Sequence, residues 1–234
     1  GNRDRRKNKG YNSFFKRLYL IYLMKKKVTI VDYGLGNILS AQQSFLKVAE
    51  DNKLNVSVVI TNRPEVISNS THIVLPGQGA FATCINNLIN IKGMIKQLTK
   101  SVMEDKIPFL GICVGMQLLA NISFENGQHK GLGWIPGEIK KLPTGGLKLP
   151  HMGWNEVKII QNNNNLIDQN EIHDFYFVHS YYFDCKQSEN IVGTTDYGIN
   201  FTSLISKENI YGVQFHPEKS SKQGLNLIKK FLEL

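Results

Sequence analysis

The sequence predicts an α/β fold with a mostly parallel central sheet and added antiparallel strands. In the first half, short β-branched runs alternate with segments of helical spacing, which is the pattern of βαβ units. In the second half, glycine and proline separate short strands, which is typical of antiparallel pairing. The 234 residues, 41% of them hydrophobic and 20% charged, fit one globular domain of this class.

The first half divides into strands and the helices between them. Apolar runs of strand length occur four times, at 27–34, 55–61, 71–77 and 107–113. Apolar side chains at helical spacing predict helices at 38–49, at 80–105 with a break at Gly93, and at 114–123.

The second half contains shorter strands and one closing helix. Strands are expected within 131–143, 151–160, 174–184, 191–198 and 201–217, and a helix at 221–234. No internal repeat or linker interrupts this order. We therefore expect a single domain at residues 25–234.

The net charge of +9 is confined to the start of the chain. Residues 1–27 hold ten of the 28 basic residues and one of the 19 acidic residues, and the rest of the chain is neutral. A body with no net charge has no basic excess to serve as an electrostatic footprint for nucleic acid. Residues 1–24 are expected to be a basic leader, either disordered or a start placed too early, with Met24 as the natural beginning. The alternative is a targeting or membrane-surface helix around the apolar run at 18–23, which is too short to span a bilayer.

The three cysteines, Cys84, Cys113 and Cys185, are odd in number and form no CxxC or metal-type spacing. Such single thiols are typical of a reducing compartment, so a cytoplasmic location is expected. No metal and no cofactor is expected from the sequence.

The segment Gly111-Ile112-Cys113-Val114-Gly115 follows a predicted strand and opens a predicted helix. This is the pattern of a nucleophile elbow, with cysteine as the nucleophile. The helix N-terminus favours a thiolate, and the Val114 N–H can donate to an oxyanion. A buried structural cysteine between packing glycines would give the same residues, so the segment alone leaves both interpretations open.

A base and its orienting carboxylate stand together near the C-terminus. The strand YGVQF ends in His216-Pro217-Glu218. A cysteine hydrolase needs an imidazole to move the thiol proton and a carboxylate to fix the tautomer of that imidazole. Pro217 restricts the backbone between the two. The other five histidines are expected to be surface or structural residues.

The loop Leu75-Pro76-Gly77-Gln78-Gly79-Ala80 follows a predicted strand. Its glycines allow a peptide plane to turn at small cost, so the loop can present a backbone N–H to a tetrahedral intermediate. An ordinary glycine turn is the alternative, and the Walker pattern of a phosphate loop is absent.

Taken together, these segments resemble the class I (triad) glutamine amidotransferases, and among them the glutaminase subunits of imidazole glycerol phosphate synthase. The resemblance spans residues 27–234 and rests on segments such as VDYGLGNILS, LPGQGAF, PFLGICVGMQLLA, LPHMGWNEV, FYFVHSYYF and YGVQFHPEKSS. It implies the three-layer, flavodoxin-like fold of that class.

The resemblance also implies roles for residues. It implies a catalytic triad of Cys113, His216 and Glu218, and an oxyanion hole formed by Val114 and the Gly77–Gln78 peptide. The positions that match glutamine-binding residues of the family are Gly79, Gln117, Ser180 and Tyr181. The family commonly has valine where this chain has Gln78, which puts the control of the loop in doubt.

The implied partner is a cyclase subunit with a (β/α)8 barrel, of the HisF type, in a heterodimer. Ammonia released from L-glutamine would pass to this subunit, which makes imidazole glycerol phosphate and AICAR in histidine biosynthesis. The segments that resemble the cyclase-facing surface contain Asn37, Met152, Trp154, Tyr176 and Lys219.

Three other functions compete with this one. A related glutaminase could serve another synthase, such as a sugar-amidinating enzyme. A catalytically silent interaction module would not need Cys113, His216 and Glu218 together. A cysteine peptidase on the same fold fits less well, because Gln117 and the LPGQGAF loop favour a small amide substrate.

Overall fold

The computed structural model describes residues 25–143, 145–161, 164–168 and 173–234. The predicted leader at 1–24 therefore lies outside the described residues. The centre of the molecule is a parallel sheet in the order β2-β1-β3-β4-β13. These strands are β1 (Lys26–Val31), β2 (Val56–Thr61), β3 (His72–Gly77), β4 (Phe109–Cys113) and β13 (Ile210–Val213).

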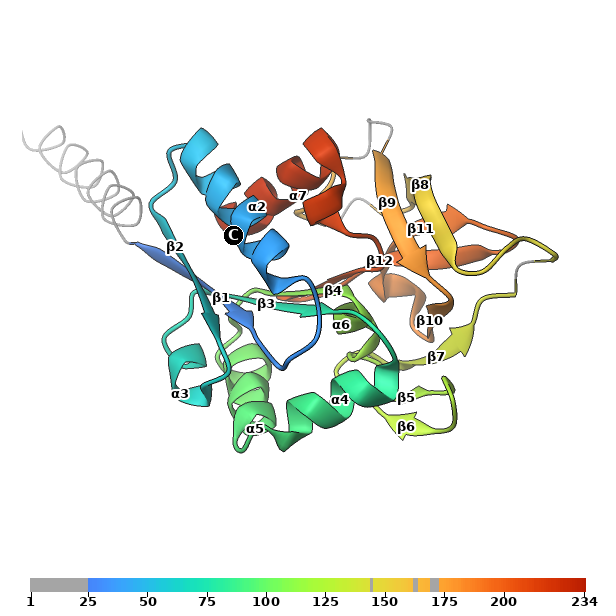
Figure 1. Ribbon diagram of the computed structural model, residues 1–234. Helices are drawn as coiled ribbons and strands as arrows, with labels where there is room; N and C mark the ends of the chain where they lie inside the picture. The colour runs from blue at the N-terminus through green and yellow to red at the C-terminus, as the bar shows by residue number, and fades with distance from the viewer. Residues whose placement is uncertain (1–24, 144, 162–163, 169–172) are drawn as a thin grey trace, which may run out of the picture.

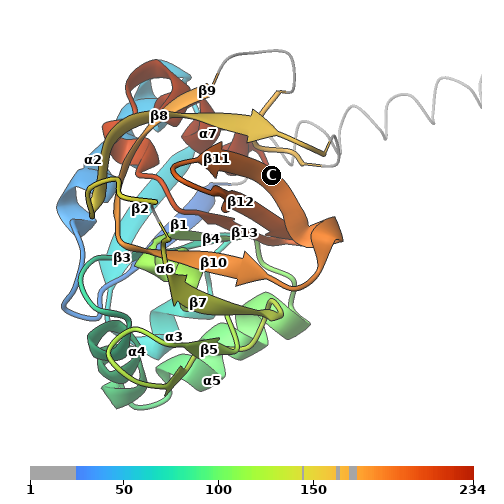
Figure 2. The same ribbon diagram turned by 90° about the vertical axis from the view of Figure 1, so that its right-hand side faces the viewer.

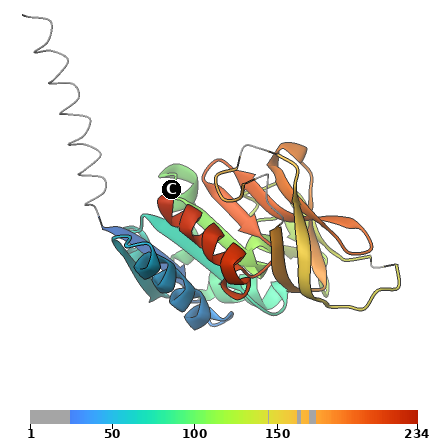
Figure 3. The same ribbon diagram turned by 90° about the horizontal axis from the view of Figure 1, so that it is seen from above.

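Helices cover both faces of this sheet (Figure 1). One face carries α2 (Ile38–Asp51) and α7 (Ser221–Glu233), which lie side by side when seen from above (Figure 3). The other face carries α3 (Pro64–Ile67), α4 (Phe81–Asn90) and α5 (Met94–Thr99), which continues into a π-helical turn, η1 (Lys100–Glu104). Gly93 separates α4 from α5 with a φ of +84°, as predicted. The result is a three-layer α/β arrangement.

The second half extends the sheet with antiparallel strands. Beyond β13 follow β12, β10 and β7, and then the short strands β5 and β6. A branch of β11, β8 and β9 leaves β12 and curls over one end of the molecule (Figure 2). The bounds are β5 (Ile122–Ser123), β6 (His129–Lys130), β7 (Gly137–Lys141), β8 (His151–Ile159), β9 (His173–His179), β10 (Tyr181–Cys185), β11 (Ile191–Asp196) and β12 (Asn200–Lys207), with 3-10 turns η2 (Ser188–Asn190) and η3 (Pro217–Lys219).

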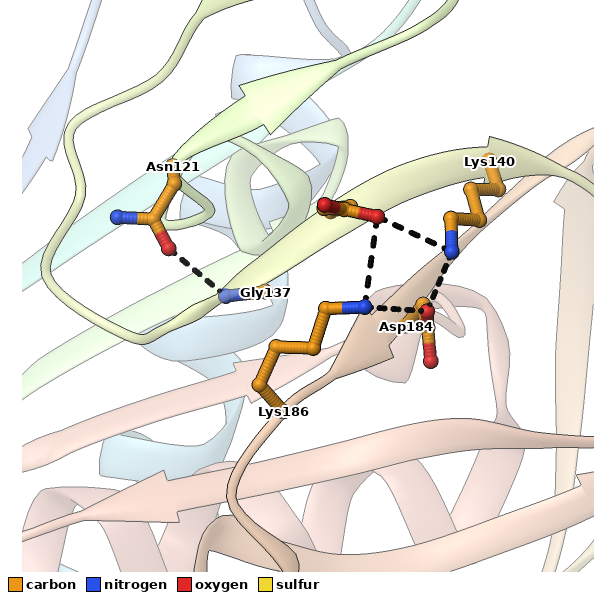
Figure 4. A network of polar contacts seen from close by, with 6 residues as sticks. Asn121, Gly137, Lys140, Asp184 and Lys186 are labelled. Carbon is orange, nitrogen blue, oxygen red and sulfur yellow. Dashed lines mark hydrogen bonds and ion pairs between the residues drawn. The ribbon is translucent and has the colours of Figure 1, made fainter.

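The pairing of β7 with β10 carries a surface network of ion pairs (Figure 4). Lys140 Nζ lies 2.7 Å from Asp184 Oδ2 and 3.0 Å from Glu138 Oε2. Lys186 Nζ reaches the same two carboxylates at 3.1 and 3.4 Å. Exposed pairs contribute at most about 1 kcal/mol each, so this network supports the strand register without dominating stability.

The predicted fold class is confirmed. The short elements α3, β5 and β6 were not predicted, and one predicted helix is shorter than expected. The helix after Cys113, expected at 114–123, ends at Gln117 (α6, Val114–Gln117). The carbonyls of Leu118 and Ala120 accept hydrogen bonds from Leu132 N and Gly133 N, at 2.8 and 3.0 Å, instead of from the next helical turn. Tertiary hydrogen bonds therefore end this helix early, and the chain enters β5.

Within the described part of the chain, no helix has the length and apolar character needed to cross a membrane.

Candidate active site

The predicted nucleophile elbow lies at the junction of β4 and α6. Cys113 has φ +54° and ψ −114°, a conformation that residues with a side chain rarely adopt. The flanking glycines permit it. A Cβ on Gly115 would lie 1.8 Å from the Leu75 carbonyl oxygen, and a Cβ on Gly111 would lie 2.6 Å from the Gly115 carbonyl oxygen. The strained turn thus depends on close backbone contacts that any side chain would block.

His216 and Glu218 stand at the turn that follows β13. His216 Nδ1 lies 2.8 Å from Glu218 Oε1, and the two side chains are 6% and 5% exposed. The turn is fixed by its backbone, since His216 N donates to the Tyr176 carbonyl at 2.9 Å and Ser220 Oγ donates to the His216 carbonyl at 2.5 Å. The carboxylate therefore contacts a buried imidazole in a turn of fixed geometry.

Cys113 and His216 line the same cavity and interact electrostatically. Burial alone would lower the pKa of His216, but the interactions with the Cys113 sulfur and the Glu218 carboxylate outweigh burial and raise this pKa to about 10. Nε2 is buried and makes no hydrogen bond of ordinary geometry with any described residue. The surroundings of His216 thus favour the imidazolium form at neutral pH.

The predicted oxyanion loop runs beside the elbow, because Gly77 pairs with Cys113 in the register of β3 and β4. The Tyr33 hydroxyl donates to the Pro76 carbonyl at 2.5 Å, and the Cys84 thiol donates to the Gln78 carbonyl at 3.5 Å. These bonds hold the two peptides on either side of the Gly77–Gln78 peptide. A backbone donor in this loop is therefore positioned by side chains from outside it.

The cavity has a volume of about 340 Å³, which is in the range of small-molecule sites. It brings together Cys113 and His216 with all the predicted glutamine-binding positions and two of the three predicted oxyanion positions. Gly77 and Glu218 do not line the cavity. Glu218 contacts His216, which does line it. The lining residues are Gln78, Gly79, Cys113, Val114, Gln117, Glu125, Pro150, Val178, His179, Ser180, Tyr181 and His216.

A larger hollow of about 880 Å³ lies along α2 and the start of β2. No cysteine or histidine lines it, so it offers no thiol and imidazole pair. Among the described residues, no group of three or more His, Cys, Asp or Glu side chains is arranged to hold a metal ion.

Gln214 is a functional candidate that the sequence analysis missed. Its side chain is fully buried, and its Nε2 donates to Cys113 Sγ at 3.7 Å. Its Oε1 accepts from Gln117 Nε2 at 3.0 Å, and the same nitrogen donates to the Tyr181 carbonyl at 3.1 Å. Gln214 thus connects Cys113, the predicted nucleophile, to a predicted substrate-binding residue. A polar residue inside the apolar strand segment YGVQF, two residues before the base, was the available signal.

Glu125 is a second candidate that was missed. It is half-buried in the cavity wall, and its Oε2 accepts a hydrogen bond from the Phe81 backbone N–H at 2.9 Å. It follows the short strand β5, an element that the sequence did not predict. An acidic residue in an expected loop gave no signal of its position.

The predicted partner surface lies on neighbouring elements. Trp154 and Tyr176 are paired across β8 and β9, with ring centroids 6.3 Å apart. Met152 and Trp154 are 61% and 54% exposed. Lys219 and Asn37 are also exposed, on η3 and at the N-cap of α2, two elements in contact with each other.

Comparison with known proteins assigns this chain to a family. The family model "Glutamine amidotransferase class-I" matches residues 30–234. A solved glutamine amidotransferase has a TM-score of 0.66 at 14% identity, over 88% of this chain and 97% of that one. A second, from Thermotoga maritima, has a TM-score of 0.58 at 17% identity, over 86% and 79%. The chain belongs to the class-I glutamine amidotransferases.

Closer relatives narrow this class. A protein of Methanococcus maripaludis called imidazole glycerol phosphate synthase subunit HisH 2 is 46% identical over 210 residues, which are 88% of this chain and 98% of the relative. The subunit HisH of Pelagibacter ubique is 44% identical over 209 residues, covering 88% and 99%. Within its class, the chain therefore belongs to the HisH subunits, which are enzymes.

Proposed function

We propose that this chain hydrolyses glutamine through Cys113, His216 and Glu218 and passes the ammonia to a cyclase subunit. The observation that carries the proposal is a cysteine in a strained elbow that shares a cavity with an imidazole held by a buried carboxylate at 2.8 Å. Each of the three has the surroundings that its role requires.

The reaction begins with the thiol proton of Cys113 already on His216, because the raised pKa of His216 keeps its imidazole protonated. The thiolate attacks the side-chain carbonyl carbon of glutamine, and the negative charge moves to the carbonyl oxygen. The backbone N–H of Val114 and the Gly77–Gln78 peptide stabilise this oxyanion. His216 then returns the proton to the amide nitrogen, the C–N bond breaks, and ammonia leaves a glutamyl thioester on Cys113.

Water completes the cycle. His216 takes a proton from water as the oxygen attacks the thioester carbonyl, and the C–S bond breaks to release glutamate. The starting pair of Cys113 sulfur and protonated His216 is thereby restored. Glu218 supports the imidazolium, which forms again in each cycle.

Glutamine is held by groups of matching polarity. Glu125, the carboxylate on the cavity wall, suits the α-ammonium group of the substrate. The amide of Gln117 and the wall formed by Gly79, Ser180 and Tyr181 offer further hydrogen bonds. Two hydrogen bonds fix the amide of Gln117 before substrate arrives, which reduces the entropy lost on binding.

The proposed partner is a cyclase subunit of the HisF type, which has a (β/α)8-barrel fold. The two subunits would form a heterodimer that makes imidazole glycerol phosphate and AICAR. The names of the relatives support this assignment, since they are subunits of imidazole glycerol phosphate synthase. The exposed Met152 and Trp154 give β8 a surface suited to an interface. The amidotransferase domain spans 25–234, and the three free cysteines suit a cytoplasmic location.

Replacing Cys113 by alanine tests the proposal in the assembled complex. Turnover with glutamine should be abolished, because no thioester forms, while turnover with added ammonia persists. Cys185→Ala is the matched control, since Cys185 is a half-buried thiol outside the cavity, and should retain both activities. Glutamate release by Cys113→Ala would refute the nucleophile, and activity only with another synthase would favour the sugar-amidinating alternative.

A further inference from the structure

Two buried histidines beside the cavity take no part in the hydrolysis described above. His151 lies on β8, and His179 ends β9 and lines the cavity. His151 Nδ1 and His179 Nε2 are 2.8 Å apart. The ring of His151 is stacked between Phe177 and Tyr197, with centroid distances of 4.8 and 4.1 Å. Both rings are therefore held in place and share one hydrogen bond.

The direction of this bond follows from its surroundings. Asn155 Oδ1 accepts from the Glu156 backbone N–H at 2.8 Å, and Asn155 Nδ2 donates to the Asp196 carbonyl at 2.9 Å. The orientation of the amide is thus fixed by two backbone groups of known polarity. The same Nδ2 lies 3.1 Å from His151 Nε2, which must therefore accept.

A neutral ring that accepts at Nε2 donates at Nδ1. His151 Nδ1 consequently donates to His179 Nε2, and His179 Nδ1 donates to the Tyr181 carbonyl at 2.9 Å. Starting instead from the Tyr181 carbonyl, which can only accept, gives the same two tautomers in reverse order. The chain of bonds from Asn155 to Tyr181 is consistent from both ends.

An extra proton on either ring would disrupt this series of hydrogen bonds. If either ring carried protons on both nitrogens, two donors would face each other at His151 Nε2 or between the two rings. Burial also disfavours the charged form of each ring. It lowers the pKa of His151 to about 4 and that of His179 to about 3. The neighbouring imidazoles of His151 and His216 lower the pKa of His179 further.

The inner end of the chain reaches the substrate wall. The Tyr181 carbonyl accepts from His179 and also from Gln117 Nε2. Ser180 and Tyr181 line the cavity together with Gln117. A displacement of His179 would therefore move both the wall and the amide that face the substrate.

We propose that Asn155, His151 and His179 form a directed hydrogen-bond relay, with both rings neutral and protonated at Nδ1, that positions the Ser180–Tyr181 wall for glutamine. His151 and His179 are positioning residues, since they act through the Tyr181 carbonyl and Gln117. The kinetic part of this inference rests on the proposed glutaminase function, whereas the tautomers do not.

The tautomers can be read directly in the full-length wild-type chain. Long-range 1H–15N spectra of the histidine side chains at about pH 7 should show Nδ1 protonated and Nε2 unprotonated for both His151 and His179. A proton on Nε2 of either ring, or an imidazolium at this pH, would overturn the relay. This measurement needs neither turnover nor a variant, so loss of the proposed function would leave it unaffected.

Two substitutions of His179 test the positioning role. In His179→Asn the side-chain amide can take the place of Nδ1 and donate to the Tyr181 carbonyl. In His179→Gln it reaches the place of Nε2 instead, and that carbonyl keeps only the hydrogen bond from Gln117. We expect KM for glutamine to rise about tenfold in His179→Gln, the loss of one hydrogen bond, and less than about threefold in His179→Asn.

His72→Gln is the matched control. His72 is a buried histidine on β3 that packs against Phe231 and does not line the cavity. Its substitution should lower stability and leave KM for glutamine unchanged. Equal increases of KM in both His179 variants, or an increase in the control, would overturn the positioning role. If the variants do not fold, the wild-type tautomers still decide.

Discussion

Replacing Glu218 by glutamine removes one charge and keeps the shape of the site. The glutamine amide oxygen can still accept from His216 Nδ1, which now lies 2.8 Å from a carboxylate oxygen. Hydrogen bonds to charged groups contribute about 1.5–3 kcal/mol, and neutral ones about 0.5–1.5 kcal/mol. The imidazolium should therefore lose about 1–2 kcal/mol of stabilisation, which lowers the pKa of His216 by roughly one unit.

This change has a defined sign in a pH profile. In the wild-type chain the pKa of His216 is about 10, so the imidazolium persists well above neutral pH. In Glu218→Gln the pKa of His216 should be about one unit lower. The alkaline limb of kcat/KM for glutaminase turnover should shift to lower pH by the same amount. The assay is glutamate release in the complex, together with an NMR titration of the His216 ring.

Stability gives an independent readout of the same change. Since the folded pKa of His216 lies above its unfolded value of about 6.5, its contribution is complete below that value and disappears as pH rises through about 10. The difference in unfolding free energy between wild type and Glu218→Gln should thus be largest near pH 6. An unchanged pKa of His216, or an alkaline limb at the same pH, would refute the assigned role of Glu218.

Two further substitutions test the elbow and the oxyanion loop. Gly115→Ala would place a Cβ 1.8 Å from the Leu75 carbonyl oxygen. Because this oxygen belongs to the backbone, we expect the free energy of unfolding in urea to fall by at least about 3 kcal/mol. A decrease below about 1 kcal/mol would contradict the close approach. Burial raises the pKa of Cys84 to about 11, so this thiol remains a donor to the Gln78 carbonyl at neutral pH. Cys84→Val should lower kcat about three- to tenfold while Cys84→Ser retains it, and equal losses would exclude the anchoring role.

The tight turn at Cys113 and the contact between His216 and Glu218 were predictable because the information for each is local. The glycines around Cys113 and the pair His216 and Glu218 each occupy a few consecutive residues, and the backbone contacts that need them follow from a tight strand-to-helix turn. The parallel strands were predictable for a similar reason, since each is a short apolar run. In both cases the physical requirement lies within one segment.

The remaining features depend on contacts between distant segments. The helix after Cys113 ends early because residues 131–133 take its carbonyl groups, and nothing within 114–123 reveals this. Gln214 acquires its position from Gln117, almost a hundred residues earlier in the chain, and the relay of His151 and His179 requires the pairing of β8 with β9. Single polar residues of this kind have no distinctive spacing in the sequence.

The most direct test of the central claim is to trap the thioester. The complex is mixed with glutamine, quenched in acid during turnover, digested and analysed by mass spectrometry. We expect a glutamyl adduct on the peptide that contains Cys113, more abundant in any variant that slows the attack of water. Undiminished glutamate release with no adduct on Cys113, or with the adduct on Cys84 or Cys185, would contradict the mechanism.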